Sequence, residues 1–145
     1  MLTVAFHDIY KHPLDKSHRF PMVKYELIPE QLLRENTCTS ENFFVPGTIN
    51  SNDILAAHKK TYLDKLDNQE FSKKEVRAIG FPMSSRLIMR EKLIAQGTIE
   101  GALSALKHGV AMNIAGGTHH AFSDRAEAFC ILNDQAIAAK HLILS

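Results

Sequence analysis

The chain has 145 residues, of which 45% are hydrophobic and 23% charged, and its net charge is +1 with neutral histidines. This length suffices for one domain with a buried core, and the composition is that of an ordinary globular protein. A charge near zero gives no reason to expect a nucleic acid or an anionic membrane as a partner. No run approaches the roughly 18 apolar residues that cross a bilayer, and no signal peptide begins the chain.

The two cysteines, Cys38 and Cys130, lie far apart in the sequence and form no CxxC pair. They therefore indicate neither a zinc knuckle nor a disulfide framework, and a reducing compartment fits them best. We expect one structural unit over residues 1–145, located in the cytoplasm.

The N-terminal part of the chain predicts one buried strand followed by a loop and helices. In chain order we expect a strand over Leu2–Phe6, a loop over Tyr10–Pro21, a helical region over Met22–Glu35, a turn-rich connector over Phe43–Thr48 and a helix over Ile54–Leu66. Pro29 cannot continue a regular helix, so we expect two short helices around it. Asn52 or Asp53 can cap the last helix.

Three of the eight histidines, His7, His12 and His18, lie close together in the first loop. Their spacing fits no standard metal-binding pattern, and the chain between them is a proline-containing loop. We therefore interpret them as loop residues and not as metal ligands. His58 falls on the inner side of a predicted helix and is most simply a partly buried helix histidine.

The C-terminal part predicts two further strands separated by helices. We expect a polar surface turn or short helix over Asp67–Lys74, a strand over Glu75–Phe81 and a helix from Ser84 or Ser85 through Ala95. A helix from Thr98 to His108, with Ile99, Ala102, Leu103 and Leu106 inward, a strand over Val110–Ala115 and a helix from Asn133 to the end complete the prediction. Gly97 and Gly109 would end the two middle helices. Strands that alternate with helices indicate parallel βα units and an α/β fold.

Paired histidines follow the last predicted strand, where the ligand sites of open α/β sheets lie. Neighbouring side chains of an extended chain point to opposite faces, so His119 and His120 can meet only if the backbone turns. Gly116-Gly117 provides that turn. A neutral imidazole accepts a proton and a charged one donates it, which suits hydrolysis, usually beside a metal ion. The alternative is a polar loop whose histidines only form local hydrogen bonds.

The wider pattern AGGTHHAF…D…FC…ND closely resembles the histone deacetylase superfamily, which includes acetylpolyamine amidohydrolases and acetoin-utilisation proteins. The run YKHPLDKSHRFPMVKY is similar to the start of the bacterial branch near class IV, and IGFPMSSRLIMR and GTIEGALSALKHGVAMNIAGG match intervening segments in order. The resemblance covers nearly the whole chain. It implies a three-layer arginase/deacetylase-like α/β fold with a mainly parallel central sheet. Residues 1–145 would form the N-terminal half of that catalytic domain.

The resemblance also implies roles for the residues of the motif. His119 and His120 match the catalytic pair, one as general base on a zinc-bound water and the other as electrostatic or acid catalyst. Phe129 matches the aromatic wall of the channel for the acyl-lysine stem. Gly117 lies in the glycine pair that lines the floor of the site.

Further positions match the superfamily less closely. Arg19 matches an arginine at the internal cavity through which acetate leaves, and Cys130 would line the same cavity. Tyr25 and Asp134 belong to the motif, and we interpret both as structural, with Asp134 near a helix start. Ala128 stands where the superfamily has glycine; if that position requires a positive φ, its Cβ costs roughly 1 kcal/mol and narrows the channel mouth.

The superfamily's zinc ligands, an Asp-x-His and a later Asp, have no counterpart in these residues, and neither does its oxyanion tyrosine. We therefore expect Zn²⁺ for the complete domain but no metal ligand within this chain. Three hypotheses remain open: a zinc-dependent deacylase of acetylated lysines, polyamines or small amides that needs its other half, a binding or assembly module that pairs through an exposed sheet edge, and a decayed fragment. The edge would allow self-association or pairing with a C-terminal half.

Overall fold

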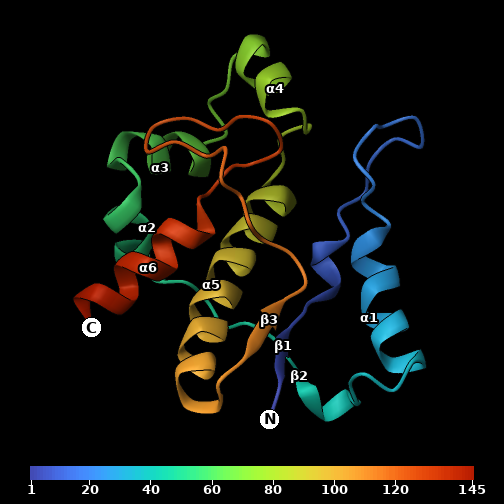
Figure 1. The fold of residues 1–145 in the computed structure, drawn as a ribbon. Helices are drawn as coiled ribbons and strands as arrows, with labels where there is room; N and C mark the ends of the chain where they lie inside the picture. The colour runs from blue at the N-terminus through green and yellow to red at the C-terminus, as the bar shows by residue number, and fades with distance from the viewer.

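The computed structural model describes all residues from 1 to 145. The elements run in the order β1 (Thr3–Ala5), η1 (Asp8–Tyr10), α1 (Lys24–Arg34), η2 (Ser40–Asn42), β2 (Phe43–Phe44), α2 (Ser51–Ala57), α3 (Lys60–Asp67), α4 (Lys73–Ile79), α5 (Ser85–His108), β3 (Ala111–Asn113) and α6 (Asp134–Leu144). Figure 1 shows the short strands between α5 on one side and α1 on the other. This layered arrangement confirms the predicted α/β fold class.

The sheet has three parallel strands in the order β2-β1-β3. Its central strand carries Val4, which is fully buried and pairs with Phe43 on one side and Met112 on the other. β3 lies at an edge of the sheet, and Met112 is 42% exposed there. The expectation of parallel strands is confirmed, and so is the exposed edge at the last strand.

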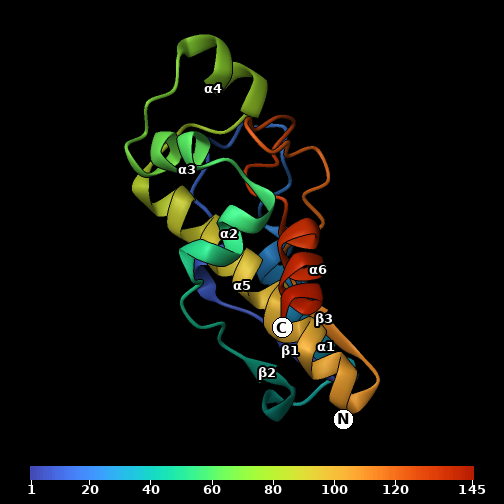
Figure 2. The same ribbon diagram turned by 90° about the vertical axis from the view of Figure 1, so that its left-hand side faces the viewer.

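The longest helix, α5, crosses the whole domain and packs against β1, β3 and α6 (Figure 2). It was predicted as two helices separated at Gly97, and that prediction was wrong. A Cβ at Gly97 would lie 2.7 Å from the hydroxyl oxygen of Tyr10 and 2.9 Å from Nδ2 of Asn113. The glycine therefore allows close packing inside a continuous helix. Leu103 and Leu106, both predicted to point inward, are 36% and 74% exposed, because this end of the helix extends past the core.

The second predicted strand, Glu75–Phe81, was also wrong, because these residues mostly form α4. Ser72 and Glu75 form a capping box at its start, and Gly80 ends it with a φ of 84°. The S-x-x-E spacing of Ser72 and Glu75 is the local sequence signal for this helix start. The sheet instead contains β2, a short strand that was not predicted. It lies in the region that was expected to be a turn-rich connector.

Two other helical predictions were reversed. Pro29 lies inside the single helix α1, where its ring is buried. Packing of the apolar side of α1 outweighs the loss of one backbone hydrogen bond. The helix expected over Ile54–Leu66 is two helices, since His58 has an extended backbone and is only 3% exposed. Asn50, and not Asn52 or Asp53, caps the first of them.

The helix α4 stands at the end of the molecule opposite the N-terminus in both views (Figures 1 and 2). The segment between β3 and α6 reaches toward this end of the molecule, beside α3 and α4. No helix of the structure combines the length and the apolar character needed to cross a membrane.

Candidate active site

The paired histidines follow a tight glycine turn at the carboxyl end of β3. Gly116 has a φ of 140° and Gly117 a φ of 73°, values that favour glycine. A Cβ at Gly116 would also lie 2.5 Å from Oδ2 of Asp134. The turn therefore requires glycine at Gly116 for both its backbone conformation and its packing; the sequence predicted the turn but not the packing.

The carboxylate of Asp134 stabilises this turn through hydrogen bonds. Asp134 is 2% exposed and is the first residue of α6, which confirms its predicted place at a helix start. Its Oδ1 accepts hydrogen bonds from the backbone nitrogen of Thr118 at 2.9 Å and from Oγ1 of Thr118 at 2.6 Å. Its Oδ2 accepts from Oγ1 of Thr98 at 2.6 Å and from the nitrogen of Gly117 at 3.2 Å. Four donors thus fix the turn to α5 and α6.

The two histidine rings lie next to each other above this anchored turn. Their centroids are 4.1 Å apart, and both side chains are exposed. Nδ1 of His119 lies 2.9 Å from the carbonyl oxygen of Gly117. Because a carbonyl can only accept, Nδ1 carries the proton, and Nε2 of neutral His119 keeps its lone pair. The local hydrogen bond therefore orients a ring whose free nitrogen can accept a proton.

The segment that carries Phe129 meets the histidine segment at Cys130. Burial raises the pKa of the Cys130 thiol, and a hydrogen bond from the backbone of His120 partly offsets this. Nδ2 of Asn133 donates to the carbonyl oxygen of Ala121 at 3.1 Å. The predicted channel-wall residue is thus next in sequence to Cys130, whose thiol lies near the backbone of His120.

The segment that carries Phe129 has two consecutive residues with positive φ angles. Ala128 has a φ of 48° and Phe129 a φ of 67°. The expected positive φ at Ala128 is therefore present, at a cost of roughly 1 kcal/mol for a residue with a Cβ. Two backbone hydrogen bonds hold this conformation, from the nitrogen of Ala128 to the oxygen of Ala78 at 2.9 Å and from Phe129 to Ile79 at 2.7 Å.

The ring of Phe129 belongs to an aromatic cluster. Its centroid lies 5.0 Å from those of Phe20 and Phe81 and 6.0 Å from that of His18. The exposed side chain of Arg19 places its guanidinium carbon 5.0 Å from the centroid of the same ring. The structure thus brings Arg19 to the wall residue, while Cys130 on the same segment is buried.

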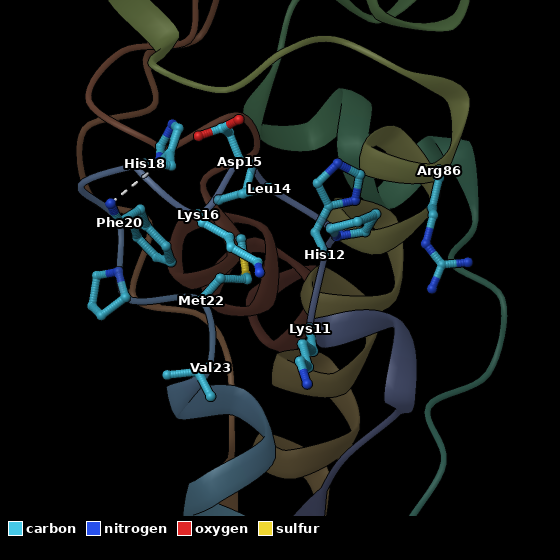
Figure 3. A pocket seen from close by; sticks show the side chains of 12 residues that line it. Lys11, His12, Leu14, Asp15, Lys16, His18, Phe20, Met22, Val23 and Arg86 are labelled. Atoms are coloured by element: carbon cyan, nitrogen blue, oxygen red, sulfur yellow. Dashed lines mark hydrogen bonds between the residues drawn. The ribbon is translucent and has the colours of Figure 1, made fainter.

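Two cavities adjoin these segments. One of about 410 Å³ lies under the glycine turn, and Gly117, Tyr25 and Asp134 line it. The other, of about 590 Å³, lies inside the loop after β1 (Figure 3). His12 lines this second cavity and is 5% exposed; burial, then the nearby positive charges of α5, lowers its pKa. The histidine pair does not line either of these cavities.

No three His, Cys, Asp or Glu side chains converge closely enough to hold a metal ion. The histidines of the first loop instead form local contacts: His7 accepts from the nitrogen of Ile9, and His18 bonds to the carbonyl oxygen of Gly80. The donor set of this chain therefore does not fit a zinc ion, which needs three or four such ligands.

Sequence reasoning missed three residues that build the site. Thr118 precedes the histidine pair directly and could have been recognised as a turn residue whose hydroxyl bonds nearby groups. Thr98 was predicted to begin a helix, but it lies within α5, and its hydroxyl donates to Asp134. His18 was recognised only as a loop residue, and its contact with Gly80 joins segments 62 residues apart.

The fold and the histidine turn define an α/β protein with acid/base side chains at the carboxyl end of a parallel strand. The chain matches the family model of the histone deacetylase domain over residues 18–145. It is 37% identical over 137 residues to an uncharacterized protein of Picosynechococcus, covering 94% of this chain and 46% of that protein. It is 27% identical to the acetoin utilization protein AcuC of Staphylococcus aureus, covering 98% of this chain and 37% of that protein.

Two solved structures share the fold of this chain. A crystal structure of a histone deacetylase homolog complexed with SAHA superposes with a TM-score of 0.80 at 25% identity, over 99% of this chain and 41% of that one. A homolog from Aquifex aeolicus gives a TM-score of 0.79 at 23% identity, with the same coverage. The chain therefore belongs to the histone deacetylase family, and it spans less than half the length of these relatives.

Proposed function

We propose that this chain provides the acid/base half of a deacetylase active site, which removes acyl groups from acetylated lysines or acetylated amines. The observation that carries the proposal is the contact between the two histidine rings, 4.1 Å apart on a turn fixed by the buried Asp134. Preorganised groups lower a reaction barrier because no reorganisation is needed during the reaction. Membership of the family supports the same conclusion.

In this proposal the histidines move protons and the neighbouring segments orient the substrate. His119, protonated at Nδ1, accepts a proton from water at Nε2, and His120 donates a proton to the leaving amine. Phe129 and Gly117 line the channel for the acyl-amine stem, and Ala128 narrows its mouth. Arg19 and Cys130 belong to the path by which the released acid leaves.

The proposal places zinc binding on ligands outside these 145 residues, since the side chains of this chain do not fit a zinc site. Zinc held by such ligands would supply polarisation of the amide carbonyl and of the attacking water. The zinc content of the purified chain tests this part, and we expect it to be far below one ion per chain. Stoichiometric zinc together with deacetylation of an acetyl-lysine peptide would contradict it.

The roles of the histidines can be tested in a chimera, in which residues 1–145 replace the matching segment of the Picosynechococcus relative. We expect the chimera to release acetate from an acetyl-lysine peptide, and we expect His119→Ala or His120→Ala to lower kcat by about 100-fold or more. The matched control is His108→Ala, an exposed histidine at the end of α5, which should leave kcat unchanged. Unchanged turnover in both site variants would remove the assigned roles.

A second function, as an assembly module, is favoured by the outer edge of β3. Val110 and Met112 are 51% and 42% exposed there, although parallel strands are usually covered. A second copy, or a polypeptide with a C-terminal half, could add a strand at this edge. Sedimentation tests self-association: we expect Met112→Lys to prevent it and Leu106→Lys, at an exposed site outside the strand, to leave it unchanged. A monomer at all concentrations would exclude the second copy.

A further inference from the structure

The wall residue Phe129 rests on the last turn of α4. Its backbone nitrogen donates to the carbonyl oxygen of Ile79, and that of Ala128 donates to Ala78. The ring itself covers Gly80, since a Cβ there would lie 2.6 Å from Cε1 of Phe129. The backbone at Phe129 is therefore attached to the end of α4, while the ring also packs against Phe20 and Phe81.

The helix α4 is attached to the domain by Ile79, which is fully buried in the core, and by one ion pair. The ion pair between Lys65 and Glu75 joins it to α3, and its side chains are 32% and 39% exposed. The hydrogen bond from Lys65, with the Ser72 cap, holds the pKa of the Glu75 carboxyl at about 2. Solvent-exposed pairs of this kind contribute little to anchoring. The backbone at the end of the helix, at Gly80, has a further partner in the loop after β1.

His18 is this partner, and its ring tethers the end of α4 to the loop after β1. Its Nε2 lies 2.8 Å from the carbonyl oxygen of Gly80, and its Nδ1 lies 3.1 Å from the backbone nitrogen of Phe20 (the dashed line in Figure 3). The carbonyl must accept and the amide must donate, so the ring is the neutral tautomer with a proton on Nε2. The ring also stacks on Phe81, with centroids 5.8 Å apart. Both nitrogens and one face of the ring are thus engaged.

We propose that His18 is a positioning residue that fixes the channel wall: through the oxygen of Gly80 it holds the end of α4, and the end of α4 holds Phe129. The functional meaning of this tether rests on the proposed role of Phe129 in the acyl channel. The tether itself consists only of hydrogen bonds within this chain and does not depend on that role. It makes the width of the channel depend on a residue from the first loop.

Hydrogen exchange of individual amides in the 145-residue chain tests the tether. In His18→Asn, the shorter side chain can still accept from the nitrogen of Phe20, as Asp15 accepts from Ser17 at 2.8 Å, but it cannot reach Gly80. We expect the amides of Ala128 and Phe129 to exchange about tenfold faster, because one hydrogen bond that closes this segment is lost. The amides of α5 should keep their protection.

The matched control is His7→Asn. Nδ1 of His7 accepts from the nitrogen two residues later, as in His18, but the structure shows no bond from His7 to a distant segment. We expect this variant to leave Ala128 and Phe129 as protected as in the original chain. A second variant, His18→Phe, keeps the stacked ring and removes both hydrogen bonds, and it should accelerate the same two amides.

Three results would overturn the tether: unchanged exchange at both amides in His18→Asn, an equal acceleration throughout α5, or full protection in His18→Phe. Each of these results is a hydrogen-exchange rate, which is measured without any enzymatic reaction. Failure of the tether is therefore distinguishable from failure of the proposed function, which is judged by the turnover of the chimera and its His119→Ala and His120→Ala variants.

Discussion

The turn that carries the histidine pair and the segment that carries Phe129 are neighbours, but they are held in different ways. Asp134, which fixes the histidine turn, is buried and joins α5 to α6 in the core. Phe129 is fixed by the end of α4, a short helix at the periphery, and its segment has two consecutive residues with positive φ. The difference predicts that the turn under the histidine pair is more resistant to local opening than the segment at Phe129.

The largest expected effect is the loss of the anchor under the histidine turn. Asp134→Ala leaves the nitrogens of Gly117 and Thr118 and the hydroxyl of Thr98 without their acceptor, so we expect it to lower the free energy of unfolding by about 3 to 5 kcal/mol. Urea denaturation followed by circular dichroism measures this. The control Asp124→Ala removes an exposed ion pair with Lys59 and should cost less than about 1 kcal/mol. Equal losses in both variants would contradict the anchor.

A smaller effect is expected from adding a methyl group to the same turn. Gly116→Ala introduces a Cβ 2.5 Å from the carboxylate of Asp134 at a φ of 140°, and we expect it to cost about 2 to 3 kcal/mol. Gly109→Ala is the matched control, since its φ is 88° and nothing lies within 4 Å of the added Cβ; strain alone should cost it about 1 kcal/mol. The comparison fails if the two glycines tolerate alanine equally.

The pH dependence of stability tests the connection between α2 and α6. Burial lowers the pKa of His58, whose Nε2 accepts from the nitrogen of Asn133 at 3.0 Å. The folded protein thus favours the neutral ring, so this stability is complete above the ordinary value of 6.5 and is lost as the pH falls below it. Protonation removes a hydrogen bond worth about 1 to 2 kcal/mol.

Thermal unfolding from about one pH unit above that value to about one below it measures the effect. The control His58→Gln does not titrate, and its midpoint should fall less over this range. Parallel curves for the two proteins would show that His58 has no part in the pH dependence.

The smallest effect is expected at Ala128, where the substitution should raise the free energy of unfolding instead of lowering it. Ala128→Gly relieves the strain of a positive φ and should raise the free energy of unfolding by about 0.5 to 1 kcal/mol. Ala126→Gly, on the same segment but buried and without a positive φ, should lower it by about 1 kcal/mol. A loss of stability in both variants would show that the backbone at Ala128 is not strained.

Several elements were predictable because their signals are local. Ser84 and Gly109 marked the two ends of α5, and Asn133-Asp134 marked the start of α6. The exposed edge at β3 and the glycine turn before His119 were also predicted correctly. Ser72 and Glu75 carried an equally local signal for α4, but the apolar residues after them favoured a strand, and the local cap decided the outcome.

The sequence by itself determined the family pattern, the parallel α/β class and the order of the histidine motif, because caps, turns and motifs depend on neighbouring residues. Only the tertiary structure decided that Gly97 lies inside a helix, that Asp134 holds the turn below His119, and that His18 reaches Gly80. Those contacts join residues far apart in the chain, and their formation depends on how the helices pack on the sheet. A local pattern does not contain that packing.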